Sequence, residues 1–276
     1  MKKYSYMYLL WTIIFILFPL ILISIYSFNG NVGPGLGNYS FSLNNYKDFL
    51  DPLYVNVLFT SLWLSLLSTL LCLLIGYPIA YIISRMPARK RNSLILLFVI
   101  PMWMNFLLRT YAWLTLLGNN GLLNKFPAIF GLGPFNLMYN YKAVLLGMIY
   151  NFLPFMVLPI YSVMIKMDKN LIDAAKDLGA DDKKVFLKVI LPLSKSGIYT
   201  GITMVFIPAI STFVISNSLG GNKFYLIGNL TEQQLTFTGN WGFGSAISIY
   251  LIIIMLTSLA ITGFDLKKIR GLRLRW

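Results

Sequence analysis

Few residues of this sequence could do covalent or metal chemistry. The chain has one cysteine, Cys72, and no histidine, so the usual ligand sets for zinc, copper or haem cannot be assembled. No G-x-x-x-x-G-K-S/T loop for nucleotide phosphates is present. We therefore expect the chain to bind no metal or other cofactor. A membrane-embedded enzyme, such as a lipid-modifying transferase, would need a cluster of acids or histidines, whereas the acidic pair Asp181-Asp182 lies among lysines.

The sequence does offer a segment suited to binding another protein. It comprises residues 166–196, which we call the docking segment. Asp173-Ala174-Ala175 is followed by Gly179 six positions after the aspartate, and by Leu191-Pro192 before the next apolar block. We expect Asn170 to cap a short helix in which Asp173 takes the third position, where a carboxylate suits a capping box and the helix dipole. Gly179 would end this helix because its backbone is permissive.

A second helix is expected after that glycine. Asp181 or Asp182 can cap it, and it would run to Pro192. Its apolar face would carry Val185, Phe186 and Val189. The docking segment would thus form an amphipathic helix–turn–helix. An ordinary solvated loop is the alternative, but long connections tend to be functional or disordered, and ordered capping residues argue against disorder.

The elements that must position this segment are long apolar blocks. Hydrophobic residues make up 57% of the chain and charged residues only 12%, whereas about a quarter of the residues of soluble domains are charged. Crossing a bilayer takes roughly 20 mostly apolar residues. The blocks that meet this requirement are Tyr6–Ser27, Val57–Ser84, Ser93–Leu117, Ala143–Ile165, Gly197–Asn217 and Phe243–Phe264. The sequence predicts an all-α, polytopic membrane protein with six transmembrane helices.

These blocks divide the chain into three regions. Residues 1–56 would hold the first span and an outer loop, and residues 57–264 the membrane core with the docking segment inside it. Residues 265–276 would form a basic tail. What remains between the blocks is too short for a soluble domain, so one membrane domain is the simplest organisation.

Basic residues are distributed unevenly along the chain. If the amino terminus is inside, the inner segments carry 18 of the 23 lysines and arginines, and the outer segments and span ends carry five. Basic loops stay cytoplasmic, so we expect both termini in the cytoplasm and a multi-pass chain in a bacterial inner membrane. The net charge of +14 then requires no nucleic acid, because attraction to anionic lipid headgroups accounts for the basic tail.

Several blocks carry residues that a passive anchor would avoid. Proline interrupts the third, fourth and fifth blocks and leaves backbone carbonyls unpaired, which lipid cannot satisfy. The polar and aromatic side chains of these blocks either join neighbouring helices, form an interfacial aromatic belt, or line a translocation path. The candidates for such a path are Trp103, Asn105, Tyr111, Trp113, Tyr150, Asn151 and Phe155.

Arg109 is the one charged residue well inside a block. It lies about two turns from the outer end, and we expect its long side chain to reach the interface. The body of every block lacks aspartate and glutamate. A proton- or sodium-coupled secondary transporter normally needs such a group for its coupling ion, so this alternative is disfavoured.

The docking segment resembles the loop shared by the inner-membrane components of binding-protein-dependent ABC importers. That loop reads E-A-A, three residues, G, nine residues, then I-x-L-P. The spacing here agrees throughout, with aspartate replacing glutamate and valine replacing isoleucine. The resemblance implies a type I ABC importer permease fold and a docking surface for a cytoplasmic ATPase. The residues that it assigns to ATPase coupling are Asp173, Ala174, Ala175, Gly179, Val189, Leu191 and Pro192.

A narrower resemblance is to the permeases of spermidine/putrescine importers. The matching stretches are Gly76–Tyr81, Leu108–Trp113, Leu219–Gly221, Ile227–Asn229 and Asn240–Ala246. This resemblance implies a permease without catalysis of its own, a second permease subunit, a dimer of cytoplasmic ABC ATPases that binds ATP and Mg²⁺, and an external substrate-binding protein. Some of these stretches also occur in permeases for iron, sulfate or other solutes, so those substrates stay open.

Overall fold

The protein is helical throughout the part that the structure describes. The computed structural model describes residues 2–30, 33, 39–131, 133, 135–221 and 224–273, and the side chains of those from 7 to 263. Outside the helices, the described residues form turns and one isolated antiparallel bridge between Asn29 and Phe41. The chain divides into two compact units, Met1–Ser61 with Tyr225–Leu256, and Leu62–Phe224 with Thr257–Trp276.

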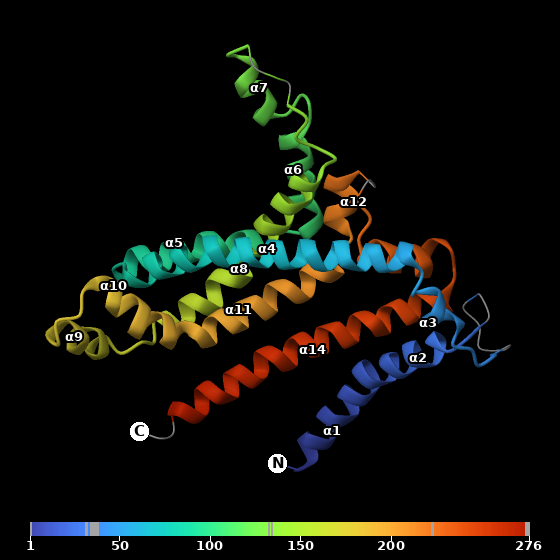
Figure 1. The fold of residues 1–276 in the computed structure, drawn as a ribbon, viewed down its shortest axis with the longest axis horizontal. Helices are drawn as coiled ribbons and strands as arrows, with labels where there is room; N and C mark the ends of the chain where they lie inside the picture. The colour runs from blue at the N-terminus through green and yellow to red at the C-terminus, as the bar shows by residue number, and fades with distance from the viewer. Residues whose placement is uncertain are drawn as a thin grey trace. The chain divides into compact units, whose positions relative to one another are not determined.

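Figure 1 shows the course of the helices along the chain. The amino-terminal half has α1 (Lys2–Thr12), the π-helical turn η1 (Ile13–Leu17), α2 (Phe18–Ser27), α3 (Asn44–Asp48), α4 (Pro52–Arg85), α5 (Ala88–Trp103), α6 (Phe106–Leu117) and α7 (Leu122–Ala128). The carboxyl-terminal half has α8 (Tyr141–Met164), α9 (Lys169–Asp177), α10 (Asp182–Val185), η2 (Phe186–Ile190), α11 (Leu191–Ser211), α12 (Val214–Gly220), α13 (Ile227–Glu232), η3 (Gln233–Phe237) and α14 (Trp241–Arg273).

The predicted membrane spans are confirmed as long apolar helices. Five helical stretches in the described residues are long and apolar enough to cross a bilayer, and a bent pair makes a sixth. The first, second, fourth and sixth predicted blocks fall on Met7–Ser27, α4, α8 and α14. The predicted basic tail lies partly in α14, which continues to Arg273, and its last three residues are outside the described part.

The third predicted span is not one straight helix. α5 and the stretch that begins with α6 meet at an angle of 97°. Pro101 lacks the N–H that would continue the helical ladder, and Met104 and Asn105 adopt extended backbone with ψ of 145° and 132°. The side chain of Asn105 then caps α6 by accepting a hydrogen bond of 2.8 Å from the N–H of Leu107. The polar residue predicted for the path thus restarts the helix after the bend.

The fifth predicted span also differs in its ends. The helix runs from Asp182 through η2 and α11 to Ser211, so the expected stop at Pro192 is wrong. A π-helical turn precedes this proline, in which the N–H of Leu191 bonds the carbonyl of Phe186, and the helix continues through it. At the other end Thr212 is extended, with ψ of 134°, and α12 starts at Val214.

One compact unit consists of Met1–Ser61 and Tyr225–Leu256. Within it, an amide and several aromatic rings join segments that are distant in the sequence. Asn45 is buried, and its amide donates to the carbonyls of Ser27 and Asn29 at 3.1 and 2.8 Å. Tyr250 of α14 stacks on Phe49 with ring centres 4.5 Å apart. These contacts tie the loop after α2 to the first half of α14.

In the other unit, α8 and α11 pack along each other. The close approach depends on Gly197, where an added Cβ would lie 2.9 Å from the Cα of Ile160 and from the carbonyl oxygen of Pro159. Small residues let membrane helices approach in this way, because dispersion contacts rather than water exclusion drive their association. Buried apolar side chains of α8, including Met156 and Ile160, fill the contact.

Replacing Gly197 with valine is expected to destabilise the protein by about 1–3 kcal/mol, because backbone atoms on α8 cannot move aside as a side chain would. The midpoint of thermal unfolding in detergent should fall measurably. Gly263→Val is the matched control, because the space around Gly263 is open within 4 Å. An equal fall for both variants would contradict the packing role of Gly197.

Candidate coupling surface and membrane cavity

The docking segment begins with a capped helix. Asp168, not Asn170 as expected, is the N-cap of α9, and its carboxylate accepts a hydrogen bond of 3.0 Å from the N–H of Asn170. Aspartate is among the strongest capping residues, and Asp168 starts the helix two residues before Asn170. Asp173 is therefore the fifth helical residue rather than the third, and it is exposed outside any capping box.

The turn after α9 is a Schellman motif. The N–H of Gly179 donates to the carbonyl of Lys176 at 2.8 Å, and the N–H of Ala180 to that of Ala175 at 3.0 Å. Gly179 has φ of +79°, a left-handed conformation that side chains with a Cβ disfavour. The expected role of Gly179 in ending this helix is confirmed, and the turn fixes the direction in which the chain enters α10.

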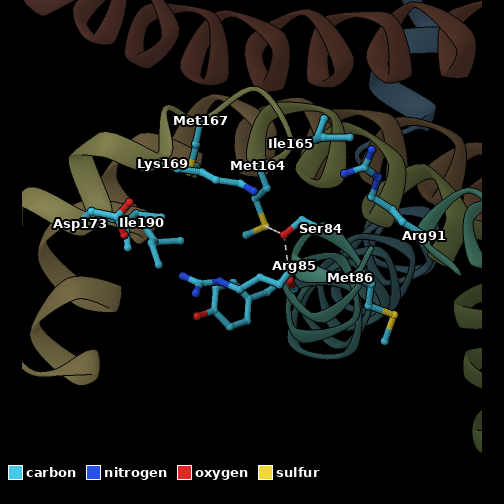
Figure 2. Close-up of a pocket in the computed structure, with 12 residues that line it drawn as sticks. Ser84, Arg85, Met86, Arg91, Met164, Ile165, Met167, Lys169, Asp173 and Ile190 are labelled. Atoms are coloured by element: carbon cyan, nitrogen blue, oxygen red, sulfur yellow. Dashed lines mark hydrogen bonds between the residues drawn. The ribbon is translucent and has the colours of Figure 1, made fainter. Parts of the chain in front are cut away.

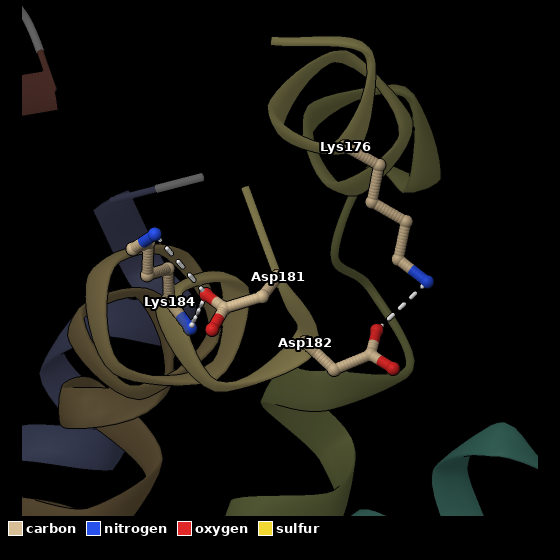
Figure 3. A network of polar contacts seen from close by, with 4 residues as sticks. All are labelled: Lys176, Asp181, Asp182 and Lys184. Carbon is tan, nitrogen blue, oxygen red and sulfur yellow. Dashed lines mark hydrogen bonds and ion pairs between the residues drawn. The ribbon is translucent and has the colours of Figure 1, made fainter. Parts of the chain in front are cut away.

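Two ion pairs hold the second helix of the docking segment (Figure 3). Asp181, one of the two residues expected to cap this helix, is the N-cap of α10. Its carboxylate accepts a hydrogen bond of 3.1 Å from the N–H of Lys184 and lies 3.8 Å from the ammonium of the same lysine. Asp182 pairs with Lys176 of α9 at 2.9 Å. These side chains are well exposed, so each pair adds little stability, but the second pair joins the two helices.

The outer face of α9 is apolar and exposed. Leu171, Ala174 and Leu178 share one side of the helix because they are spaced by three and four residues. Leu178 is 89% exposed and Leu171 49%, whereas Ile172 and Ala175 are half-buried. An exposed apolar stripe on a capped helix is typical of a surface that binds another protein. The two leucines were not predicted, although their spacing from Ala174 could have revealed them.

The docking segment runs directly into α11 and contacts α4 mainly through one aromatic side chain. Phe186 of η2 makes edge-to-face contacts with Tyr77 and Tyr81 of α4, with ring centres 5.9 and 5.5 Å apart. Tyr77 in turn shares a hydrogen bond of 3.0 Å with Ser194 of α11. Val189, Leu191 and Pro192 are half-buried along the same helix. Motion of α10 would therefore be passed to both α4 and α11.

A basic pocket of about 300 Å³ lies between the docking segment and the loop after α4 (Figure 2). Arg85, Arg91 and Lys169 contribute cations to its lining, and Asp173 contributes one carboxylate. Arg85 also lies over the ring of Tyr81, with its guanidinium carbon 4.9 Å from the ring centre. The pocket places the basic stretch Arg85–Arg91, which joins α4 to α5 and which we call the first basic loop, next to α9.

A second cavity, of about 410 Å³, lies where two spans are broken. Phe106 and Arg109 come from the start of α6, and Thr212 and Phe213 from the break between α11 and α12. The middle of α8 supplies Asn151, Phe152 and Phe155, and α11 adds Pro208 and Ser211. α6 and α12 pack against each other and against α8. Irregular backbone inside a membrane is tolerated where it lines such a cavity.

The residues predicted for a translocation path fall into three groups. Asn151 and Phe155 line the cavity. Trp113 and Tyr150 meet edge to face, with ring centres 5.3 Å apart. The remaining three are exposed and are not among the lining residues: Trp103, Asn105 and Tyr111.

Arg109 does not reach the surface, so the expectation that its side chain extends to the interface is wrong. The residue is only 7% exposed, and two of its guanidinium nitrogens, Nε and Nη1, are buried without a hydrogen-bond partner. The bend before Asn105 puts Arg109 in the first turn of α6, beside α8 and α12, instead of near the end of a straight span. Its guanidinium carbon lies 5.8 Å from the ring centre of Phe106.

The described residues offer no group of three histidine, cysteine or carboxylate side chains that could hold a metal ion. What they combine is a set of apolar helices, a cavity between broken spans and a capped helix pair between the fourth and fifth spans. These features define a multi-pass membrane permease.

Comparison with known proteins identifies the family. The family described as binding-protein-dependent transport system inner membrane component matches residues 74–270, and the chain belongs to it. This confirms the resemblance seen in the docking segment. The chain is 39% identical over 247 residues to the spermidine/putrescine transport system permease protein PotB of Haemophilus influenzae, covering 89% of this chain and 86% of that protein. PotB of Escherichia coli is also 39% identical, with 89% and 90% covered.

Solved structures support the same fold. A chain of a bacterial ABC transporter involved in the import of the acidic polysaccharide alginate matches with a TM-score of 0.80 and 13% identity, covering 97% of this chain and 95% of that one. A chain of the MetNI methionine ABC transporter matches with a TM-score of 0.57 and 15% identity, covering 78% and 95%. The predicted all-α importer permease fold is thereby confirmed.

Replacing Phe186 with alanine is expected to loosen the docking segment from α4. The two edge-to-face contacts together are worth about 1–3 kcal/mol, so local opening should increase about tenfold or more. Limited trypsin digestion, which cuts after Lys183 and Lys184, measures this opening. Leu187→Ala, at an exposed neighbouring position, is the control. Equal cleavage rates in the two variants would contradict the role assigned to Phe186.

Proposed function

We propose that this chain is one of two permease subunits of an ATP-driven importer for polyamines such as spermidine and putrescine. The observation that carries the proposal is the docking segment, with its family spacing, its Schellman turn and its exposed Leu171–Leu178 face. In this role the chain performs no catalysis. It converts motion of a partner into rearrangement of its own spans.

The partner at the docking segment is a cytoplasmic ATPase. The sequence lacks a phosphate-binding loop, so ATP and Mg²⁺ belong to a separate pair of ATPase subunits. The apolar stripe of α9 enters a cleft on one of them. Coupling residues Asp173, Ala174, Ala175 and Gly179 shape the inserted helix, and Val189, Leu191 and Pro192 connect it to α11. Phe186 against Tyr77 and Tyr81 supports rigid transmission.

The remaining partners are a second permease subunit, an external substrate-binding protein and the lipid bilayer of a bacterial inner membrane. Both termini lie in the cytoplasm, on the same side as the docking segment. The basic pocket supports this orientation, because Arg85 and Arg91 of the first basic loop line it together with Lys169. No nucleic acid takes part.

The substrate class rests on the relatives and on the chemistry of the cavity. The two PotB relatives are named as spermidine/putrescine permeases, and the chain matches nearly their whole length. Phenylalanine rings at positions 106, 152, 155 and 213 line the cavity, and each contact of a ring with an ammonium group is worth about 0.5–2 kcal/mol. Such weak contacts suit a conduit that must release its cargo, while the external binding protein supplies specificity.

Replacing Gly179 with valine is expected to abolish uptake while leaving insertion intact. The left-handed conformation costs a residue with a Cβ about 1–2 kcal/mol, so α10 is redirected without unfolding the spans. Proteoliposomes containing the whole importer and its binding protein should accumulate radiolabelled spermidine with the wild-type chain, and at least about 20-fold less with the variant. Gly131→Val is the control, because Gly131 also has positive φ, +72°, and open surroundings.

Retained uptake with Gly179→Val would contradict coupling through the docking segment. Absence of spermidine uptake with the wild-type chain, together with normal ATP hydrolysis stimulated by the binding protein, would instead contradict the substrate class alone.

A cysteine at Leu178 is expected to react only from the cytoplasmic side. In a Cys72→Ala background, a membrane-impermeant maleimide should label Leu178→Cys in inside-out vesicles from cells without the ATPase subunit, and should fail to label it in intact spheroplasts. Leu122→Cys in α7, where the native leucine is 68% exposed, should show the reverse. Labelling of Leu178→Cys in spheroplasts would overturn the proposed orientation.

A further inference from the structure

Arg109 is a buried cation that forms no ion pair with the side chains that the structure describes. It is 93% buried, its Nε and Nη1 have no hydrogen-bond partner, it lines the cavity, and its guanidinium carbon lies 5.8 Å from the ring centre of Phe106. The two ion pairs among the described residues both lie in the docking segment, far along the chain from α6. A charge left unpaired in a low-dielectric site is much more costly than one ring contact can offset.

The walls of the cavity do not neutralise this charge. Four of its side chains are phenylalanine rings. Ser211 directs its hydroxyl to the carbonyl of Ile207 at 3.3 Å. Asn151 donates to the carbonyl of Gly147 at 2.9 Å, and its own amide oxygen is buried without a partner. Neutral dipoles of this kind solvate a guanidinium only in part.

None of the ion pairs among the described residues involves Arg109, which leaves another chain as a source of the missing group. The body of each predicted block has no aspartate or glutamate. The surface beside Arg109 is exposed and apolar, with Leu108 62% exposed and Phe213 of the cavity lining 36% exposed. Such a surface faces either lipid or another membrane-embedded chain. A carboxylate is the side chain that best matches the planar donors of a guanidinium.

We propose that an aspartate or glutamate of the second permease subunit enters this cavity and forms an ion pair with Arg109 in the assembled importer. The proposal rests on the proposed function, which supplies the second permease. It also removes a conflict within that function, because an unpaired Arg109 would repel a polyamine, whereas a neutral pair would not. The amide oxygen of Asn151 remains available as an acceptor for an ammonium group.

Charge reversal tests the pair in the complete importer. Arg109→Glu should lower the amount of second permease that co-purifies with this chain at least about tenfold, and spermidine uptake at least about 50-fold. Lys125→Glu is the control, because it makes the same charge change at an exposed position of α7 that is not among the lining residues. It should leave both quantities within about twofold of the wild type.

Rescue identifies the partner residue. In the Arg109→Glu background, each aspartate and glutamate in the spans of the second permease is changed to arginine, one at a time. One such change should restore co-purification and uptake to within about threefold of the wild type. If Arg109→Glu fails to insert, Arg109→Gln is combined instead with variants of the second permease in which one acid is changed to its neutral amide. One double variant should then exceed both single variants in co-purification and uptake.

Three outcomes would overturn the pair. The first is absence of rescue by any acidic position of the second permease. The second is full assembly and uptake with Arg109→Gln alone, which would mean that neither depends on a charge at position 109. The third is a dependence of wild-type uptake on anionic phospholipid that disappears in Arg109→Gln. This result would assign the counter-charge to a headgroup phosphate. Co-purification needs no cargo, so it tests the pair even if the substrate class is wrong.

Discussion

The structure depends on one constraint: inside a bilayer, each backbone and side-chain polar group needs a partner within the protein. Where this chain keeps straight helices, the backbone satisfies itself. Where it breaks them, at Met104–Asn105 and at Thr212–Phe213, the start of the helix after the first break and the second break itself line one cavity. Asn105 caps the helix that restarts after the first break. The same cavity is where Arg109 and Asn151 keep buried polar atoms without a hydrogen-bond partner.

The docking segment is stabilised by a different set of interactions, because it lies at a water-exposed end of its unit. Its two helices are held by capping aspartates, a Schellman turn and exposed ion pairs, all of which tolerate water. This leaves the apolar face of α9 free of internal packing, with Leu178 almost fully exposed. The segment continues directly into α11, and its contact with α4 is largely aromatic, through Phe186. Local hydrogen bonds thus give the segment its shape, and helix continuity and a packed ring join it to two spans.

The positions of the spans could be predicted from composition, because about 20 apolar residues in a row have few alternatives to crossing a membrane. The docking segment could be predicted from capping chemistry and from the spacing of Asp173, Gly179 and Pro192. One error concerns the cap of α9, where Asp168 takes the place expected for Asn170, and the others concern proline and arginine. Pro101 contributes to a sharp bend whereas Pro192 is passed without a break, and the difference comes from the π-helical turn before Pro192 and the extended residues after Trp103. Arg109 was misplaced because its depth was counted along a straight helix.

The unbroken helix from Asp182 to Ser211 has a mechanical consequence. It contains 30 residues and so is about 45 Å long, at about 1.5 Å per residue. Tilting such a rod by about 5° about its Asp182 end would carry the far end through about 4 Å, close to the 5.4 Å pitch of a helix. That far end holds Ser211 and Thr212 of the cavity lining. A small rocking of the base of this helix would therefore be enough to reshape the cavity at its far end.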